Sequence, residues 1–224
     1  MVRFMSDLHC RYLKQNPYDL LIAAELLTVQ QPVHMAQSWL PEPDKRFMPA
    51  SVWPFWTDDS IGVYAELQDR DIANSADGEN QKSWKTGDVL ELFYRPLPGE
   101  AYWEFHVTPE NHHLQLLYPS EKFFRELGKQ QAGNWLDGIG LPPHSFKSET
   151  LITREKNLWR VLALIPQSMF CLPRSLRIGD EWLASFCRYD YTRGEDKPVV
   201  STTSTPPRPD FHDNSSWRRL KFAE

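Results

Sequence analysis

Cysteine is scarce in this sequence of 224 residues. The three cysteines, Cys10, Cys171 and Cys187, are odd in number and show no CxxC spacing. They therefore encode neither a disulfide framework nor a thiolate zinc site. We expect reduced thiols that pack as small hydrophobic side chains.

The sequence also lacks an excess of positive charge. The formal net charge is −5, and the basic runs are as short as Arg218-Arg219. Binding to nucleic acid needs clustered lysine and arginine to neutralise phosphates. We therefore predict that the protein does not bind nucleic acid.

Long hydrophobic runs are missing as well. No stretch of about 18 apolar residues occurs, and residues 1–10 lack the apolar segment of a signal peptide. We predict no membrane partner. Taken as written, the sequence indicates a cytoplasmic protein, and it would be a secreted one if a leader had been removed.

Glycine is sparse next to proline and the aromatic residues. The 10 glycines and 18 prolines disfavour long helices, and aromatic residues make up 13% of the chain. The length is short for two average domains but typical of one large β-sandwich. We expect a single domain of β-strands and long loops, with some of the rings stacked on a ligand.

Alternating apolar and polar residues predict several strands. Residues 88–95 and 101–108 flank a turn and form a hairpin candidate. The other predicted elements are strands at 61–68, 114–117, 159–165, 182–191 and 217–222, a helix at 121–131, a helix or buried strand at 18–29, one edge strand within 31–57, and loops at 69–83, 134–148 and 192–210. This pattern indicates an all-β, antiparallel β-sandwich with one or two short helices.

The hairpin divides its side chains between two faces. Alternation places Leu90, Leu92 and Tyr94 on one face and Glu91 on the other, and Glu104 and His106 also point away from the core. We expect this mixed face to be solvated and to line a cleft. The same alternation assigns five large rings to the core, namely Trp103, Phe105, Trp159, Trp182 and Phe186.

The order of four motifs carries a resemblance. The motifs are a strand that ends at Asp69, the run WKTGDVLELF that starts at Trp84, the run YWEFHV at 102–107, and the run FHDNSSWRRLKF at 211–222. Over residues 55–224, this order resembles the family 9 carbohydrate-binding modules and their DOMON-like relatives. The resemblance implies a jelly-roll-type sandwich, and we treat residues 1–224 as one such domain.

The resemblance also implies a function and a set of site residues. In such modules a mono- or disaccharide, or a glycan chain end, lies between two aromatic rings over the polar face of a sheet. No catalysis is involved, and the module works in polysaccharide catabolism, in association with glycoside hydrolases. The corresponding residues here are Trp84 and Phe211 as walls, Glu91, Glu104 and His106 on the polar face, Cys187 in place of an amide, and Arg208 near the second wall. His106 stands where the family has arginine, and Phe211 where the sugar-binding members have tryptophan.

No cofactor is predicted apart from calcium, which is common in the family. Asp69 and Asp71, followed by Asn74 and Asp77, offer oxygen ligands in a loop but lack the EF-hand spacing. The pair His112-His113 does not predict a metal site, because adjacent strand residues point to opposite faces.

Two other functions remain as alternatives. Glu91 and Glu104 could act as the carboxylate pair of a glycoside hydrolase, retaining at a separation of about 5 Å and inverting at a wider one. The sequence around them gives no sign of the burial that raises one pKa, so we rank binding first. A haem module using His106 and Met169 ranks last, because no spacing supports that pair.

Overall fold

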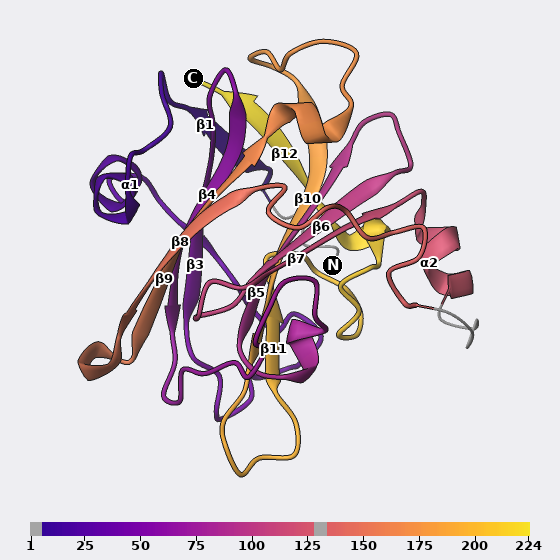
Figure 1. The fold of residues 1–224 in the computed structure, drawn as a ribbon. Helices are drawn as coiled ribbons and strands as arrows, with labels where there is room; N and C mark the ends of the chain where they lie inside the picture. The colour runs from indigo at the N-terminus through magenta and orange to yellow at the C-terminus, as the bar shows by residue number, and fades with distance from the viewer. Residues whose placement is uncertain (1–5, 128–133) are drawn as a thin grey trace.

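The computed structural model describes residues 6–127 and 134–224, and these residues form one curled β-sheet with two short α-helices (Figure 1). The strands are β1 (Leu8–Tyr12), β2 (Val33–His34), β3 (Ala50–Trp56), β4 (Ser60–Gln68), β5 (Val89–Pro96), β6 (Tyr102–Val107), β7 (His113–Tyr118), β8 (Lys147–Thr153), β9 (Leu158–Pro166), β10 (Glu181–Asp190), β11 (Val199–Thr202) and β12 (Arg218–Ala223). The helices are α1 (Leu20–Leu27) and α2 (Glu121–Leu127), and the 3₁₀ turns are η1 (Ser83–Lys85), η2 (Arg154–Lys156), η3 (Gln167–Phe170) and η4 (Asn214–Ser216).

The sheet folds over on itself. Its strand order is β7-β6-β5-β10-β12-β1-β3-β4-β9-β8, with β11 paired to β10 and β2 to β3. The short strand β1 joins the two halves and is parallel to both β12 and β3, while the other ladders are antiparallel. The predicted all-β fold with short helices is confirmed.

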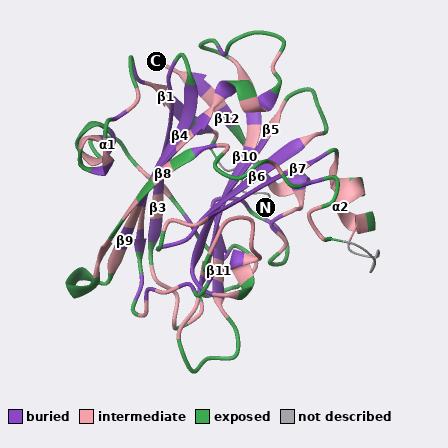
Figure 2. Ribbon diagram, viewed as in Figure 1, coloured by how far each residue is buried: buried purple, intermediate pink, exposed green. Residues whose placement is uncertain are grey.

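The main core lies between the two halves of the sheet. Apolar side chains of β5, β6 and β10 face those of β3, β4 and β9, and these strands are buried over most of their length (Figure 2). All five rings that alternation assigned to the core lie there: Trp103, Phe105, Trp159, Trp182 and Phe186. The predicted β5–β6 hairpin is also confirmed, with Glu91 opposite His106.

Helix α1 covers the outer face of β3, β4 and β9. Asp19 caps its N-terminus by accepting a hydrogen bond from the Ile22 amide at 2.9 Å, which decides the open choice between helix and strand at 18–29 in favour of helix. The covering is close. A Cβ at position 62 would lie 2.1 Å from the Phe55 ring, so only glycine fits there.

A second apolar cluster covers the face that carries Glu91 and His106. It joins strand residues such as Phe93, Tyr102 and Leu116 to side chains from α2 and the neighbouring loops. We call the loop and helix members the outer layer: Trp84, Phe123, Phe124, Trp135, Phe211 and Trp217. The expectation of a solvated mixed face along a cleft was therefore wrong, because this layer buries the polar side chains beneath it.

Four strands were not predicted. β1 falls in the N-terminal segment, β8 begins inside the loop expected at 134–148, and β11 lies inside the loop expected at 192–210. The segment 31–57 holds two strands, β2 and β3, and the expectation of one edge strand there was wrong because β3 is an interior strand between β1 and β4. Of the helix predicted at 121–131, residues 121–127 are helical, and the remainder lies outside the described residues.

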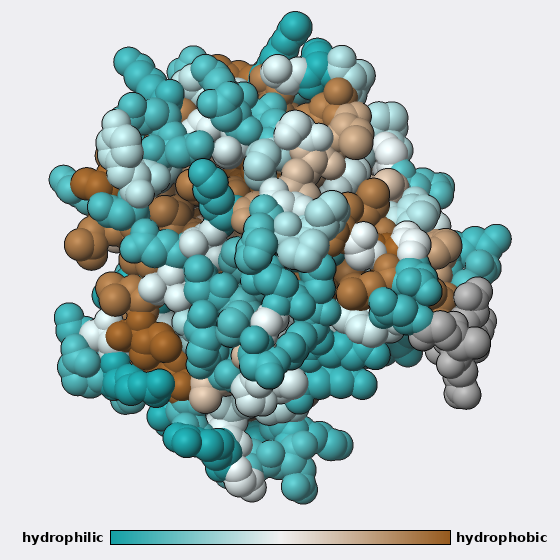
Figure 3. Space-filling view, in the orientation of Figure 1, coloured by the Kyte–Doolittle hydropathy of each residue, from teal (hydrophilic) through white to brown (hydrophobic). Residues whose placement is uncertain are grey.

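The surface differs from one side to the other. The helices lie on opposite sides of the molecule (Figure 1), and Figure 3 shows hydrophobic side chains on the side of α1, where Leu21 is exposed. Hydrophilic side chains cover the lower centre of the same view. Among the described residues, none of the helices is long and apolar enough to cross a membrane.

Candidate functional site

Three ionisable side chains meet on the outer face of β5 and β6. His106 Nε2 lies 2.5 Å from Glu104 Oε1 and 3.3 Å from Glu91 Oε1. All three residues are almost fully buried, with 3%, 4% and 0% exposure for Glu91, Glu104 and His106. The strand register explains the arrangement, because Glu91 lies directly opposite His106 and Glu104 is two residues before it on the same face.

The three groups shift one another's pKa values. Burial raises the pKa of Glu91 to about 8, with a further rise from Glu104 and an opposing effect of His106. Burial alone would lower the pKa of His106, but the two carboxylates outweigh it and raise that pKa. Burial also acts to raise the pKa of Glu104, but His212 and His106 lower it overall. The favoured state near neutral pH is therefore a protonated Glu91 beside a His106–Glu104 ion pair.

The network extends beyond these three residues. Ser83 Oγ lies 2.8 Å from Nδ1 of His106, so the second ring nitrogen also has a hydrogen-bond partner. On the other side, His212 Nε2 lies 3.7 Å from Glu104 Oε2, and its Nδ1 lies 2.8 Å from the Tyr102 hydroxyl. Neither Ser83 nor His212 was predicted from the sequence.

Aromatic rings enclose the network. Trp84 is half-buried and lies edge-on to His106, with ring centroids 5.6 Å apart, and Trp135 lies edge-on to Trp84 at 5.7 Å. Phe124 of α2 stacks on His212 at 3.6 Å. The predicted proximity of Trp84 to the polar face thus has a structural basis, and Trp135 is a further ring that the sequence reasoning missed.

Phe211 and Cys187 lie on the same face of the sheet. Phe211 is buried against Tyr189, edge-on at 5.5 Å, and its carbonyl accepts a hydrogen bond from Trp217 Nε1 at 2.8 Å. Cys187 lies opposite Glu91 in the β5–β10 register, and burial raises the pKa of its thiol. Alternation from Cys187 would have identified Tyr189, which is two residues further along β10.

Arg208 lies apart from this network. Its side chain is 77% exposed and reaches Asp210 at 3.6 Å, at the edge of a hollow of about 360 Å³ shared with Glu121 and Arg125. The structure does not place Arg208 on Glu91, Glu104 or His106.

Asp69 and Asp71, the acidic candidates for calcium, each have an arginine partner. Asp69 Oδ2 accepts from Arg188 at 2.9 Å, and Asp71 binds the guanidinium of Arg193. The structure does not bring together the two residues of the haem alternative. Met169 packs against the main core, whereas His106 lies on the opposite face of β6.

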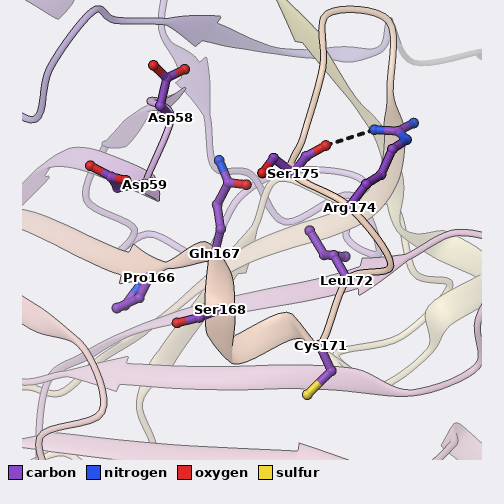
Figure 4. Close-up of a pocket in the computed structure, with 9 residues that line it drawn as sticks. All are labelled: Asp58, Asp59, Pro166, Gln167, Ser168, Cys171, Leu172, Arg174 and Ser175. Carbon is purple, nitrogen blue, oxygen red and sulfur yellow. Dashed lines mark hydrogen bonds between the residues drawn. The ribbon is translucent and has the colours of Figure 1, made fainter.

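A surface hollow of about 510 Å³ lies between the β3–β4 turn and the segment that follows β9. Figure 4 shows the carboxylates of Asp58 and Asp59 on one side and Arg174 on the other. The nine described residues that line it include no aromatic ring that could stack on a sugar.

Comparisons with known proteins were made for the sequence and for the fold. A scan against protein families gives no match, and no curated protein matches the chain. Solved structures do match. A protein from Bacteroides uniformis ATCC 8492, proposed to bind carbohydrate, superposes with a TM-score of 0.66 at 17% identity, over 97% of this chain and 100% of that one.

A family 9 carbohydrate-binding module from Caldicellulosiruptor kristjanssonii also matches. Its complex with cellotriose gives a TM-score of 0.64 at 12% identity, over 96% of this chain and 93% of that one. The chain has the fold of a family 9 carbohydrate-binding module. The complex of such a module from the same organism with glucose gives a TM-score of 0.60 at 12% identity, over 96% and 94% of the two chains.

Proposed function

We propose that this protein binds carbohydrate without cleaving it. The observation that carries the proposal is the cluster of Glu91, Glu104 and His106 beneath the half-buried ring of Trp84, on the outer face of the sheet. The ligand is a mono- or disaccharide, or the end of a glycan chain. The related structures that hold glucose and cellotriose support this choice of ligand class.

The residue types suit a sugar. An indole ring offers a flat apolar surface for the C–H face of a pyranose, and buried carboxylate and imidazole groups form strong hydrogen bonds to its hydroxyls. Trp84 supplies the first wall, and Phe211 with Tyr189 supplies the second.

The site is closed in this structure, because Glu91 and His106 are buried. A sugar reaches Glu91 only if the Trp84 ring turns away from His106 and Trp135. That movement breaks two edge-on ring contacts, each worth about 1 kcal/mol. A cost of this size is compatible with weak to moderate sugar affinity.

The test is a calorimetric and fluorescence titration with glucose, cellobiose, xylose and longer glycans. We expect quenching or a shift of tryptophan fluorescence on binding. Trp84→Ala should abolish binding, while Trp84→Phe, which keeps a flat ring, should retain part of it. The proposal fails if a broad glycan panel shows no binding, or if Trp84→Ala binds sugar as tightly as the parent protein.

A hydrolase remains the second candidate, because one observation favours it. One carboxylate oxygen of Glu91 lies within 4.8 Å of one of Glu104, and burial raises the pKa of Glu91 while His212 and His106 lower that of Glu104. The sequence-based expectation that nothing buries these carboxylates was wrong. However, His106 lies between the two carboxylates and pairs with both, where a substrate would need to enter.

The two functions are separated by turnover. If the protein is a hydrolase, Glu91→Gln and Glu104→Gln should each abolish cleavage of an aryl glycoside. We expect no cleavage by the parent protein. We further propose that the protein acts beside glycoside hydrolases in polysaccharide catabolism, which co-purification with such an enzyme on an insoluble glycan would test.

A further inference from the structure

Three possible metal ligands converge at the edge of the sheet beside β7. They come from separate segments: Glu79 from the loop before η1, His113 from the start of β7, and His144 from the loop before β8. Glu79 Oε2 lies 3.6 Å from His113 Nδ1 and 3.9 Å from His144 Nδ1. All three ligand atoms lie within 4.8 Å of one another.

Hydrogen bonds fix the orientation of the His113 ring. Ser148 Oγ donates to Asn111 Oδ1 at 2.5 Å, so its lone pair is left to accept from His113 Nε2, which lies 2.5 Å away. The proton of the neutral ring is therefore on Nε2, and Nδ1 carries a free lone pair.

The carboxylate of Glu79 is fixed in the same way. Its Oε1 accepts from the His113 amide at 3.1 Å, which leaves Oε2 directed at the two imidazoles. Neither Glu79 Oε2 nor His113 Nδ1 has a hydrogen-bond partner among the described residues, although both atoms are buried and His113 is only 7% exposed. Two acceptor atoms that face each other in a buried position are unfavourable unless a proton or a metal cation lies between them.

We propose that Glu79, His113 and His144 form a binding site for Zn²⁺. Two imidazoles and one carboxylate are a typical zinc ligand set when the fourth position is left to water. Zinc–ligand bonds of about 2.1 Å in a tetrahedron place neighbouring ligand atoms roughly 3.4 Å apart. The distances of 3.6 Å and 3.9 Å from Glu79 to the two imidazoles need to close by a few tenths of an ångström, and the two imidazole nitrogens, which lie within 4.8 Å of each other, need to close by up to about 1.4 Å through movement of the exposed His144.

The surroundings of the site fit a metal that exchanges with solvent. His144 is exposed, so the fourth position is open to water, while His113 stacks on Phe146 and is held by Ser148. A ligating histidine whose other ring nitrogen donates to a fixed acceptor is the usual arrangement at zinc. His112 precedes β7 and is not among the three converging ligands.

The metal would join two loops that carry rings of the outer layer. Glu79 lies five residues before Trp84, and His144 lies in the same loop as Trp135, which contacts Trp84. His113 lies opposite Val107 on the core side of the sheet, so the zinc site is separate from Glu91 and His106. The zinc site does not depend on the proposed sugar binding.

The test is calorimetric titration of the chelator-stripped full chain with zinc chloride. We expect one zinc ion per chain, and Co²⁺ in its place should give the visible absorption of a tetrahedral site. His144→Ala and Glu79→Gln should each weaken zinc binding at least about 10-fold, and Ser148→Ala about 10- to 100-fold. The matched control is His112→Ala, which removes a neighbouring histidine and should bind zinc like the parent.

His144 is exposed, so its variant is expected to fold, and circular dichroism would confirm this. Zinc should raise the thermal midpoint of the parent and of His112→Ala but leave that of His144→Ala unchanged. The proposal is overturned if the parent binds no stoichiometric zinc, or if His144→Ala binds zinc as tightly as His112→Ala.

Discussion

Replacing Glu91 by glutamine should change how the stability of the protein depends on pH. Glutamine has nearly the same shape and is neutral, like the protonated Glu91 that burial favours. The pKa of this carboxyl rises from an ordinary value of 4.5 to about 8 in the folded chain. Between these two pH values the folded protein holds one proton that the unfolded chain has released.

The sign and size of the effect follow from linkage. The stabilisation linked to a raised pKa is fully present below the unfolded value and is lost as the pH rises through the folded value. One proton corresponds to a fall of about 1.4 kcal/mol in unfolding free energy per pH unit, so the loss totals about 4 kcal/mol between about pH 5 and pH 8. The raised pKa of His106 adds a fall of the same sign above its unfolded value. The lowered pKa of Glu104 acts only at acid pH, where its contribution is lost as the pH falls.

The measurement is urea unfolding at four pH values from 5.5 to 8.5, followed by tryptophan fluorescence. The unfolding free energy of Glu91→Gln should fall less steeply with pH than that of the parent, by up to about 1.4 kcal/mol per pH unit. Glu100→Gln, which alters an exposed glutamate in the β5–β6 turn, is the control and should follow the parent. Parallel curves for Glu91→Gln and the parent would refute a protonated, buried Glu91.

Two further predictions concern the core and the thiols. Arg188 is buried and pairs with Asp69 at 2.9 Å and with Asp190 at 3.2 Å, so Arg188→Met should lower the unfolding free energy by about 3–5 kcal/mol in urea titrations. The control is Arg193→Met, which removes an exposed arginine and should lower the unfolding free energy by less than about 1 kcal/mol. Equal losses for the two variants would contradict the argument. Of the three cysteines only Cys171 is exposed, so a thiol reagent should react rapidly with one thiol in the native protein and with three in denaturant. Two or more rapidly reacting thiols in the native protein would show that a buried cysteine is accessible.

The sequence predicts the regular strands well because their pattern is local. In β4, β5 and β6 one face is apolar throughout, and in β10 it is apolar from Trp182 to Phe186, so alternation gives both the strand and the side that faces the core. β1 was missed although Leu8 and Cys10 alternate into the core. It is only five residues long, and its position depends on parallel pairing with β3 and β12, far away in the chain.

The ion pairs show the same limit. Arg188 and Asp190 are two residues apart in β10, so alternation places them on one face, and the structure pairs them at 3.2 Å. Asp69 joins them from the end of β4, 119 residues earlier, and no local pattern indicates that. The same limit applies to the site. Alternation placed Glu91, Glu104 and His106 on one face, but Ser83, His212 and Trp135 come from distant loops and were not predicted.

One signal in the sequence did oppose an open cleft. Phe93 and Tyr102 lie on the same face as Glu91, as do Leu114 and Leu116 of β7, and large apolar side chains on a polar face need a cover. The outer layer supplies that cover, and the charges beneath it explain why it can close. With Glu91 protonated and His106 paired with Glu104, the buried cluster has no net charge, whereas an isolated buried carboxylate would cost several kcal/mol. The aromatic residues that suggested ligand stacking therefore serve first to enclose a neutral polar network, in which Trp84 is the half-buried ring beside His106.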